Sequence, residues 1–453
     1  MRDESDIFEV IRTKKGLNIP ISGKAEKTFG ECRLPDLFAI KPTDFHGLTP
    51  KMAVKESDPV KAGTTLFFDK IHPEIKFVSP VSGTVKLINR GERRRLLEVI
   101  VESDGKDDCE TIEIPDASAL DREKTINILL ESGAWTYLKQ RPYDIIANPD
   151  DMPKAIFVSG FDTSPLAPDV DFVLTGMDRA LHAGIGALMK LCPVHVALQH
   201  GAPAKICTNH MHVNHHYFAG QHPAGNVGVQ IHHILPIAKG EKVWTVTPQE
   251  VVSIGNLFLT GKLDFSRIMV IAGPSVEKPM YVRYKLGASI SELVKNNVKE
   301  GHIRYISGNI LTGQQIEPNG FVGFHDTLVT VIPEGDKQEF FGWATPGFGK
   351  FSTSRSFFSP LCKKRQYPLN ANMHGGQRAI VVSGEYDKVM PMDILTEYLI
   401  KAILAEDIDK MEQLGIYEVV EEDIALCEFV CSSKLQLQSI LRKGFELMIK
   451  EIG

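Results

Sequence analysis

Alternating apolar and polar positions in the first hundred residues predict short β-strands. Ile75 to Ile88 contains two such runs on either side of a Pro-Val-Ser-Gly turn, and Leu96 to Val101 continues the pattern. Successive side chains of a strand point to opposite faces, so this alternation is typical of a sheet with one buried face. We expect residues 1–112 to form a β-rich domain that includes short strands within residues 10–26.

The pattern changes after Lys154 to unbroken apolar runs separated by helical spacing. Ala155 to Gly160, Val194 to Leu198 and Lys242 to Val246 have the composition of parallel strands that are buried on both faces. Between them, apolar residues of Asp178 to Met189 recur at helical spacing. Buried strands that alternate with helices predict a Rossmann-like α/β domain over residues 113–257.

A third pattern follows, with strands on both sides of a short helix. Arg267 to Ala272 is a predicted strand, and Ser289 and Glu292 have the spacing of a capping box at a helix start. Ile303 to Leu311 and Phe321 to Val331 add predicted strands. This arrangement resembles a β-grasp module of the soluble-ligand-binding type, which we expect over residues 258–332.

The last part of the chain divides into an irregular segment and a helical one. Residues 333–378 are rich in aromatic residues and glycine, and end near a basic trio, Lys363-Lys-Arg365. They are expected to form either a packed linker or a docking surface for a membrane partner. From Ile394 to Leu404 apolar residues recur at helical spacing, which predicts a helical domain over residues 379–453.

Overall composition excludes several classes of protein. The chain has 453 residues, 43% of them hydrophobic, and a formal net charge of −6, which argues against non-specific nucleic-acid binding. Its seven cysteines are scattered, which favours a reducing compartment over a disulfide framework. The charged N-terminus does not resemble a secretory signal. No run approaches the ~20 apolar residues that span a bilayer, so we expect no transmembrane segment.

One segment, Ile206 to Ala238, stands apart because it contains no Asp, Glu, Lys or Arg, although 24% of the chain is charged. It holds seven of the 15 histidines: His210, His212, His215, His216, His222, His232 and His233. A long charge-free segment is expected to be buried between domains or beside a ligand. Its second half, His222 to His233, is predicted to be a turn that leads into a helix.

A metal site is one possible role of the first half of this segment. His210 and His212 would share one strand face, with His215 and His216 close by. The segment has no carboxylate, HExxH or CxxC partner, so we expect no metal site and hydrogen-bonded histidines instead.

The first domain resembles the barrel-sandwich hammerhead of biotinyl and lipoyl domains. In those domains a modified lysine sits at a hairpin tip, and Lys70 in Phe68-Asp-Lys-Ile71 lies near the corresponding place. Lys70 lacks a clear tip motif, so we expect the fold without the modification. A carrier role through Lys70 is the alternative.

Five segments together resemble one family, the NqrA subunits of the Na+-translocating NADH:quinone reductase of bacterial membranes. They are Lys15-Gly-Leu-Asn-Ile-Pro-Ile-Ser-Gly23, Gly176-Met-Asp-Arg-Ala-Leu-His182, Gly220 to Ile234, Gly375-Gly-Gln-Arg-Ala379 and Val389-Met-Pro-Met-Asp393. The family is similar in fold to the NADH- and flavin-binding subunit of respiratory complex I and to the C subunit of the Rnf complex. Those relatives use a glycine-rich loop for flavin and a C-terminal cysteine cluster for iron–sulfur.

This chain departs from those relatives at both places. Its C-terminal motif is only Cys427-Glu-Phe-Val-Cys431, two thiolates short of a 4Fe–4S cluster. His-Pro and Asn replace the acidic pattern in what resembles the flavin-loop region. The resemblance thus implies a peripheral subunit without cofactor, metal or catalytic residues of its own. FMN, FAD, iron–sulfur and riboflavin are expected in partner subunits.

The resemblance also implies where the chain acts and with what. We expect it at the cytoplasmic face of the bacterial inner membrane, docked chiefly on membrane subunits, with ubiquinone or menaquinone as a possible ligand. Two roles stay open for the His-rich segment, an internal interface or contact with a quinone head group. The candidate residues are His222, Gly225, Gly228, Gln230, His232 and His233. A rival function is an independent flavin- or NADH-binding oxidoreductase that retains the ancestral site.

Overall fold

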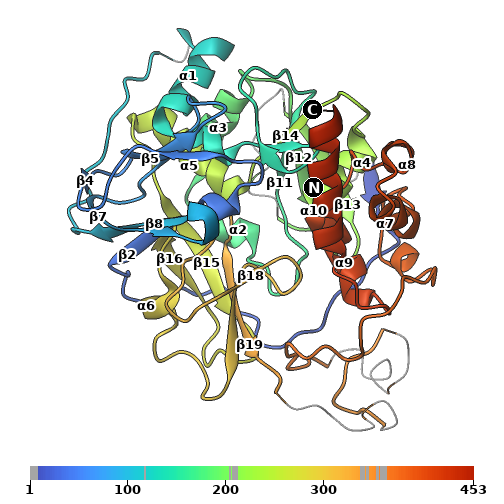
Figure 1. Cartoon of the computed structure of the whole chain (residues 1–453). Coiled ribbons are helices and arrows are strands. Elements are labelled where there is room, and N and C mark those ends of the chain that lie inside the picture. The colour runs from blue at the N-terminus through green and yellow to red at the C-terminus, as the bar shows by residue number, and fades with distance from the viewer. Residues whose placement is uncertain are drawn as a thin grey trace, which may run out of the picture.

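The computed structural model describes residues 9–116, 119–203, 206, 213–336, 342, 346–353, 357 and 365–452. Figure 1 shows a β-rich N-terminal part at the left, a sheet flanked by helices, a second, mixed sheet at the lower centre of the view, and C-terminal helices at the right beside the helix-flanked sheet. The candidate residues His210 and His212 and the basic residues Lys363 and Lys364 lie outside the described residues.

The N-terminal part consists of two small antiparallel sheets. One has the order β2 (Leu37–Ile40), β8 (Leu96–Ser103), β7 (Gly83–Arg90) and β4 (Pro59–Val60), and the other β3 (Pro50–Met52), β5 (Thr65–Asp69) and β6 (Lys76–Val78). Phe67 and Phe77 are fully buried and their rings stack with centroids 4.6 Å apart. Because alternate residues face this core, the predicted strands form as expected, and the barrel-sandwich prediction is confirmed.

The central sheet has seven strands. Their order is β1 (Val10–Arg12), β13 (Asn214–Ala219), β12 (Val194–Gln199), β11 (Ile156–Ser159), β14 (Val243–Thr245), β9 (Lys139–Arg141) and β10 (Ile145–Ile146). Neighbours from β1 to β14 run parallel, and β9 and β10 are antiparallel. The three strands predicted from apolar runs are confirmed as β11, β12 and β14. β1, which the sequence placed with residues 1–112, forms the edge of this sheet beside β13.

Helices cover both faces of the seven-stranded sheet. α3 (Asp178–Leu188) and α5 (Pro248–Thr260) lie on one face, and α4 (Val227–Ile234) lies on the other. Three further helices precede α3 in the chain: α1 (Arg122–Ser132), η5 (Ala134–Tyr137) and α2 (Val170–Val173). Ile156 and Val158 of β11 pack in the core with α3 and α5, whereas Phe157 packs with α4 and the C-terminal helices. Burial on both faces explains why β11 is an unbroken apolar run.

The third part is a mixed five-stranded sheet. Its order is β16 (Met280–Lys285), β15 (Ser266–Ala272), β19 (Leu328–Pro333), β17 (Ile303–Ser307) and β18 (Gln314–Ile316), and its helix is α6 (Ile290–Val294). Ser289 caps α6 by accepting from the backbone N–H of Ser291, but Glu292 pairs with Lys295 and does not complete a capping box. The predicted strand Phe321 to Val331 begins only at Leu328. The preceding residues form a loop instead.

The C-terminal part is helical, as predicted. It contains η8 (Tyr386–Lys388), α7 (Thr396–Leu404), α8 (Ile408–Gln413), α9 (Glu421–Val430) and α10 (Leu437–Ile452). Cys427 and Cys431 are both fully buried, but Cys431 is the residue after α9, where its Sγ lies 2.9 Å from the hydroxyl of Tyr386. Within the described part of the chain, no helix combines the length and apolar character needed to cross a bilayer.

Candidate functional site

A cavity of about 800 Å³ opens at the carboxyl ends of β11 and β14. The chain leaves β11 towards β12 and β13 on one side and returns to β14 on the other, so the strand order reverses at this point. In open α/β sheets ligands bind in the crevice that such a reversal creates. The loop before β19 and the helices α9 and α10 close the remaining sides.

One wall of the cavity carries paired charges. Lys139 Nζ lies 3.0 Å from Asp144, and the guanidinium of Arg141 bridges Glu422 and Asp423, with Nη1 2.6 Å from Asp423 Oδ2. A bidentate ion pair joins Arg442 of α10 to Glu421 of α9. The pairs of Arg141 join β9 of the seven-stranded sheet to α9, whereas the other two ion pairs each lie within one part of the molecule.

The electrostatics of this wall follow from burial and pairing. Burial opposes the charged forms of Lys139 and Asp144, but their mutual attraction outweighs it, so the pKa of Lys139 is raised and that of Asp144 is lowered. For Glu422, burial and the carboxylates of Asp423 and Asp144 raise the pKa although Arg141 opposes them. Lys139 and Asp144 are therefore both charged at neutral pH.

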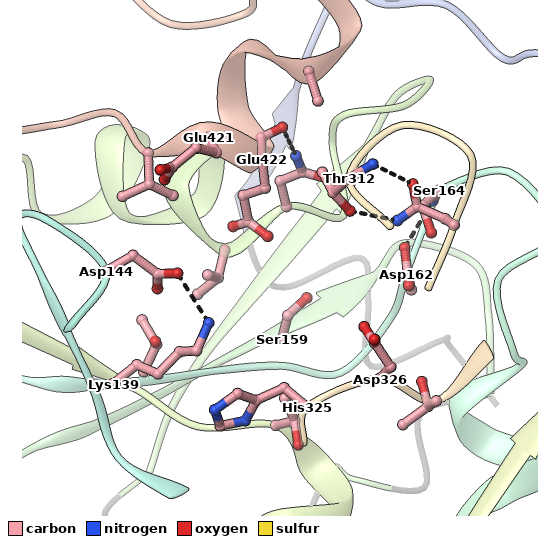
Figure 2. A pocket seen from close by; sticks show the side chains of 18 of the residues that line it. Lys139, Asp144, Ser159, Asp162, Ser164, Thr312, His325, Asp326, Glu421 and Glu422 are labelled. Carbon is pink, nitrogen blue, oxygen red and sulfur yellow. Dashed lines mark hydrogen bonds and ion pairs between the residues drawn. The ribbon is translucent and has the colours of Figure 1, made fainter. Parts of the chain in front are cut away.

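The opposite wall is built by the loop after β11 and by the start of the His222 turn. Figure 2 shows Asp162 and Ser164 across the cavity from Lys139 and Asp144, with Ser159 between them. Asp162 Oδ1 accepts from the backbone N–H of Ser164 at 2.7 Å, and burial raises the pKa of this carboxyl. His222 Nδ1 lies 3.2 Å from the hydroxyl of Thr163. Burial lowers the pKa of His222 to about 4, so the ring is neutral at pH 7.

Four of the six candidate residues lie at the cavity or directly behind its walls. His222 and Gly225 line the cavity. Gly225 packs against the loop after β11, because an added Cβ would come within 2.6 Å of the Thr163 backbone nitrogen. A Cβ on Gly228 would lie 2.3 Å from Asp423 Oδ1, and Gln230 is fully buried with Nε2 donating to Ser159 at 2.8 Å. Protein atoms fill the space beside both glycines.

The other two candidates face away from the cavity, towards the C-terminal helices and the surface. His232 Nδ1 lies 2.7 Å from Glu418, and its Nε2 accepts from the backbone N–H of Asp393 at 3.0 Å. His233 is exposed, and its ring stacks on Phe218. His222 of the charge-free segment therefore lines the cavity, whereas His232 connects α4 to the C-terminal helical part.

Two of the histidines considered for a metal site, His215 and His216, lie within the described residues, and the fold does not bring them together. His215 and His216 are consecutive on β13 and so point to opposite faces. His216 Nε2 lies 3.0 Å from Nδ1 of His195 on β12, and the two rings stack. His210 and His212 lie outside the described residues. In the described ranges no group of three or more His, Cys, Asp or Glu side chains is placed to hold a metal ion.

The residues around the cavity do not fit a phosphorylated flavin or dinucleotide. A phosphate in a Rossmann-type site binds the backbone N–H groups of a helix N-terminus. At α5 the carboxylate of Glu250 already occupies this position, where it accepts from the backbone N–H and the hydroxyl of Thr247. At α4 Asp423 lies against Gly228, and Asn226 Nδ2 donates to the Glu422 carbonyl at 3.0 Å. Acidic residues outnumber Lys and Arg in the lining, which further disfavours phosphate.

Sequence reasoning missed several polar residues of the cavity, above all Glu250, His325 and Arg141. Thr247 and Glu250 do have the spacing of a capping box, a local signal that marks Glu250 as a helix-start residue. Nothing local marks His325, which Figure 2 shows at the lower edge of the cavity beside Asp326. Its place depends on how the third part packs against the seven-stranded sheet.

Lys70, the candidate for modification, does not line this cavity and lies in the turn after β5. Its side chain is exposed, and its backbone N–H donates to Thr49 at 2.8 Å. The side chain lies at a hairpin end of the N-terminal part, as the resemblance to biotinyl domains implies.

Comparison with known proteins places nearly the whole chain in one family. Residues 11–104 match the NqrA N-terminal barrel-sandwich hybrid domain, residues 120–263 the NqrA second alpha/beta domain and residues 268–317 the NQRA C-terminal domain. The NqrA subunit of the Na(+)-translocating NADH-quinone reductase of Serratia proteamaculans is 39% identical over 439 residues, covering 96% of this chain and 98% of the relative. The same subunit of Vibrio atlanticus is 36% identical over 445 residues, covering 98% and 100%.

A solved NAD+-reducing nickel–iron hydrogenase in the air-oxidized state is similar at only 10% identity and a TM-score of 0.38, over 74% of this chain and 62% of the other. That likeness is too low to bear on function. The match to NqrA extends over the full length of its members and includes each of the three β-containing parts. The chain therefore belongs to the NqrA family, one of the subunits of the Na(+)-translocating NADH-quinone reductases.

Proposed function

We propose that this chain is a peripheral subunit of a Na+-translocating NADH:quinone oxidoreductase, which couples electron transfer from NADH to quinone with sodium export. The observation that carries the proposal is the match to NqrA over 96–98% of the chain at 36–39% identity. The chain contributes to an oxidoreductase complex and performs no redox catalysis alone. It docks chiefly on membrane subunits at the cytoplasmic face of the bacterial inner membrane.

The chain holds no flavin or iron–sulfur centre in this proposal, and FMN, FAD, riboflavin and iron–sulfur belong to its partners. Support comes from the carboxylates of Glu250 and Asp423 at the two helix N-termini where a phosphate would bind. The sulfur atoms of Cys427 and Cys431 are buried against Tyr386, and burial raises the pKa of Cys427. An independent flavin-binding oxidoreductase, the alternative, would require a phosphate to displace these groups.

The proposal retains the finer fold and domain assignments. Parallel β11, β12 and β14 with helices on both faces support a Rossmann-like domain at 113–257, and the five-stranded sheet around α6 supports a β-grasp domain at 258–332. The remaining divisions are 1–112, 333–378 and 379–453. β1 crosses from the first of these to the central sheet, so the domains share structure at this edge.

The cavity is the proposed site for a quinone head group, either ubiquinone or menaquinone. An uncharged ring suits a site whose phosphate positions are filled. Phe161, Val246 and Leu311 give the lining apolar surface, and neutral His222 gives it a hydrogen-bonding group. In the competing role, His222 serves only the interface between the α/β part and its neighbours through its contact with Thr163.

Assembly and activity test the proposed role in the complex directly. In membranes that lack only this chain, we expect sodium-dependent NADH:quinone reductase activity to be lost and to return with the purified wild-type chain. The chain should also co-purify with the membrane fraction when the other subunits are present and remain in the supernatant when they are absent. Full activity without the chain would contradict the proposal.

Absorbance of the purified chain separates the two functions. A cofactor-free subunit is colourless, whereas an independent flavin enzyme is yellow and releases flavin on denaturation. The purified wild-type chain is expected to show no flavin absorbance after reconstitution with FMN or FAD and desalting. Stoichiometric retained flavin would favour the alternative.

A further inference from the structure

The hairpin formed by β7 and β8 ends in a strongly basic turn. The turn comprises residues 90–95, and η3 (Glu92–Arg94) lies within it. It contains four arginines, Arg90, Arg93, Arg94 and Arg95, and one acidic residue, Glu92. The whole chain has a formal net charge of −6, so the charge of this turn is opposite in sign to that of the protein.

The charge of the turn is not neutralised by ion pairs. All four arginines are exposed, and within the described part of the chain none of them forms an ion pair with a carboxylate. Two acidic residues close to the hairpin have other partners. Glu98 Oε1 accepts from Asn89 Nδ2 at 3.0 Å, and Glu56 Oε1 accepts from the backbone N–H of Ile88 at 2.9 Å. The guanidinium groups are therefore available to a partner outside the chain.

Backbone hydrogen bonds hold the turn in a defined conformation. The N–H of Gly91 donates to the carbonyl of Arg95 at 2.9 Å, and the N–H of Arg95 donates to the carbonyl of Glu92 at 3.1 Å. Arg93 and Arg94 have φ of 53° and 62°, in the left-handed region that glycine and asparagine adopt more readily. Arginine is unfavourable for the backbone at both positions, which points to a role for its side chain there.

We propose that the turn at residues 90–95 is an electrostatic contact with the anionic phospholipid headgroups of the membrane. This contact rests on the proposed function, which places the chain at a membrane face. A guanidinium group donates two parallel hydrogen bonds to phosphate oxygens and stays charged at physiological pH. Each basic residue held at an anionic lipid surface adds to binding, because the negative surface potential attracts it.

The shape of the turn favours a lipid surface over an acidic protein as the partner. A hairpin end is convex and offers no groove for a segment of another protein, whereas specific protein interfaces are built around a well-packed centre. A bilayer presents many phosphate groups without a fixed arrangement. Opposite charge is therefore sufficient for the contact, and shape complementarity is not required.

Sedimentation of the purified full-length chain with lipid vesicles tests this contact. Vesicles of phosphatidylglycerol and phosphatidylethanolamine supply anionic headgroups, and vesicles of phosphatidylcholine alone carry no net charge. We expect the wild type to sediment with the anionic vesicles at low salt and to remain in the supernatant with the others. At about 0.5 M salt it should be released, because screening shortens the reach of surface charges well below about 10 Å.

A variant of the turn removes its charge and respects its backbone. Arg93→Asn/Arg94→Asn/Arg95→Gln replaces three guanidinium groups with neutral amides, and asparagine suits the left-handed conformation at the first two positions. Binding to the anionic vesicles should fall roughly tenfold or more. Thermal melting verifies the fold. If this variant does not fold, Arg95→Gln leaves both left-handed positions intact and should still weaken binding.

The matched control removes three exposed lysines from other parts of the chain. Lys190→Gln/Lys262→Gln/Lys278→Gln lowers the net charge by the same amount as the variant of the turn. It should retain wild-type binding to the anionic vesicles. Equal losses in the two variants would show that only the net charge matters, and would overturn the role of the turn.

The remaining outcomes separate this contact from the proposed function. A wild-type chain that does not sediment with anionic vesicles overturns the lipid contact, whereas its assembly with the membrane subunits is measured independently. If the variant of the turn then fails to assemble with those subunits, the turn binds a protein surface instead. A wild-type chain that binds the vesicles through the turn but does not restore reductase activity contradicts the proposed function and leaves the lipid contact in place.

Discussion

Arg141 on β9 donates from Nη1 to Oδ2 of Asp423 on α9 at 2.6 Å, and both side chains are almost completely buried. The pair joins the seven-stranded sheet to the C-terminal helices beside the cavity. Asp423 also accepts from the backbone N–H of Val420 at 2.9 Å, at the start of α9. Loss of either partner would leave the other charge buried and unpaired, which is strongly unfavourable. The contact therefore holds the C-terminal helices in their position on the sheet.

Removal of the Arg141 charge tests this contact. Arg141→Met leaves Asp423 and Glu422 without their cation, and we expect a loss of about 3–5 kcal/mol in the free energy of unfolding. Urea denaturation followed by circular dichroism measures it. Lys86→Ala is the matched control, because Lys86 and Glu102 form an ion pair of 2.7 Å with both side chains about half exposed. That variant should lose less than about 1 kcal/mol, and equal losses in both would contradict our account.

Gly228 is required by the same contact. An added Cβ would lie 2.3 Å from Asp423 Oδ1 and 2.4 Å from Arg141 Nη1, so Gly228→Ala should lower the melting temperature by forcing the pair apart. Gly186 on α3 offers a matched control, because an added Cβ there meets no atom within 4 Å. Gly186→Ala is expected to stabilise the chain by roughly 0.5–1 kcal/mol, the usual gain for alanine within a helix. Stabilisation by both substitutions would show that the interface around Gly228 accommodates an added methyl group, which would contradict the prediction.

His232 and His222 are expected to behave differently when each is replaced by alanine. Both ring nitrogens of His232 are bonded, to Glu418 and Asp393, and neither faces the cavity. His232→Ala should cost about 1–3 kcal/mol of stability and leave quinone affinity unchanged. His222→Ala should weaken quinone binding if the ring touches the ligand. If it lowers only the melting temperature, His222 is an interface residue.

Stability should decrease in mild acid because His222 is buried as a neutral ring. Its pKa falls from the ordinary 6.5 to about 4 in the fold, with burial as the cause. Between these values the unfolded chain binds more protons than the folded one, so the free energy of unfolding falls as the pH drops from about 6.5 to about 4. Urea denaturation at a series of pH values measures this slope. His222→Gln, which cannot titrate, should show a shallower slope than the wild type.

Lys70 provides a test of the carrier alternative. Lys70→Arg keeps the positive charge of an exposed turn residue but removes the primary amine that a carrier group would occupy. We expect unchanged turnover of the assembled complex and an intact mass of the natural chain that equals its sequence mass. A large loss of turnover with an unaltered melting curve would establish a carrier role.

Local pattern was sufficient to predict the central elements. β11, β12 and β14 appear in the sequence as apolar runs because helices cover both of their faces, and α3 appears as a helical period because one side of it is buried. In each case the alternation between buried and exposed side chains, or their continuous burial, is visible over a few consecutive residues. The barrel-sandwich part and the helical C-terminal part were predictable for the same reason.

Contacts between distant segments were not predictable from such patterns. β1 pairs with β13 some two hundred positions later, and its three residues carry no signal that names their partner. The predicted strand from Phe321 begins only at Leu328, and the residues before it turn towards the cavity. Strand pairing and loop direction depend on the sheet edge that is available, which is a tertiary property.

The sequence by itself determined the order of the main elements and the unusual character of Ile206 to Ala238, because composition and periodicity are local. Only the tertiary structure decided which residues share the cavity with His222, because Arg141, Glu250 and His325 come from separate elements that meet at the reversal of strand order. Burial and pairing set the charge states of such groups, and both arise only when the parts pack together.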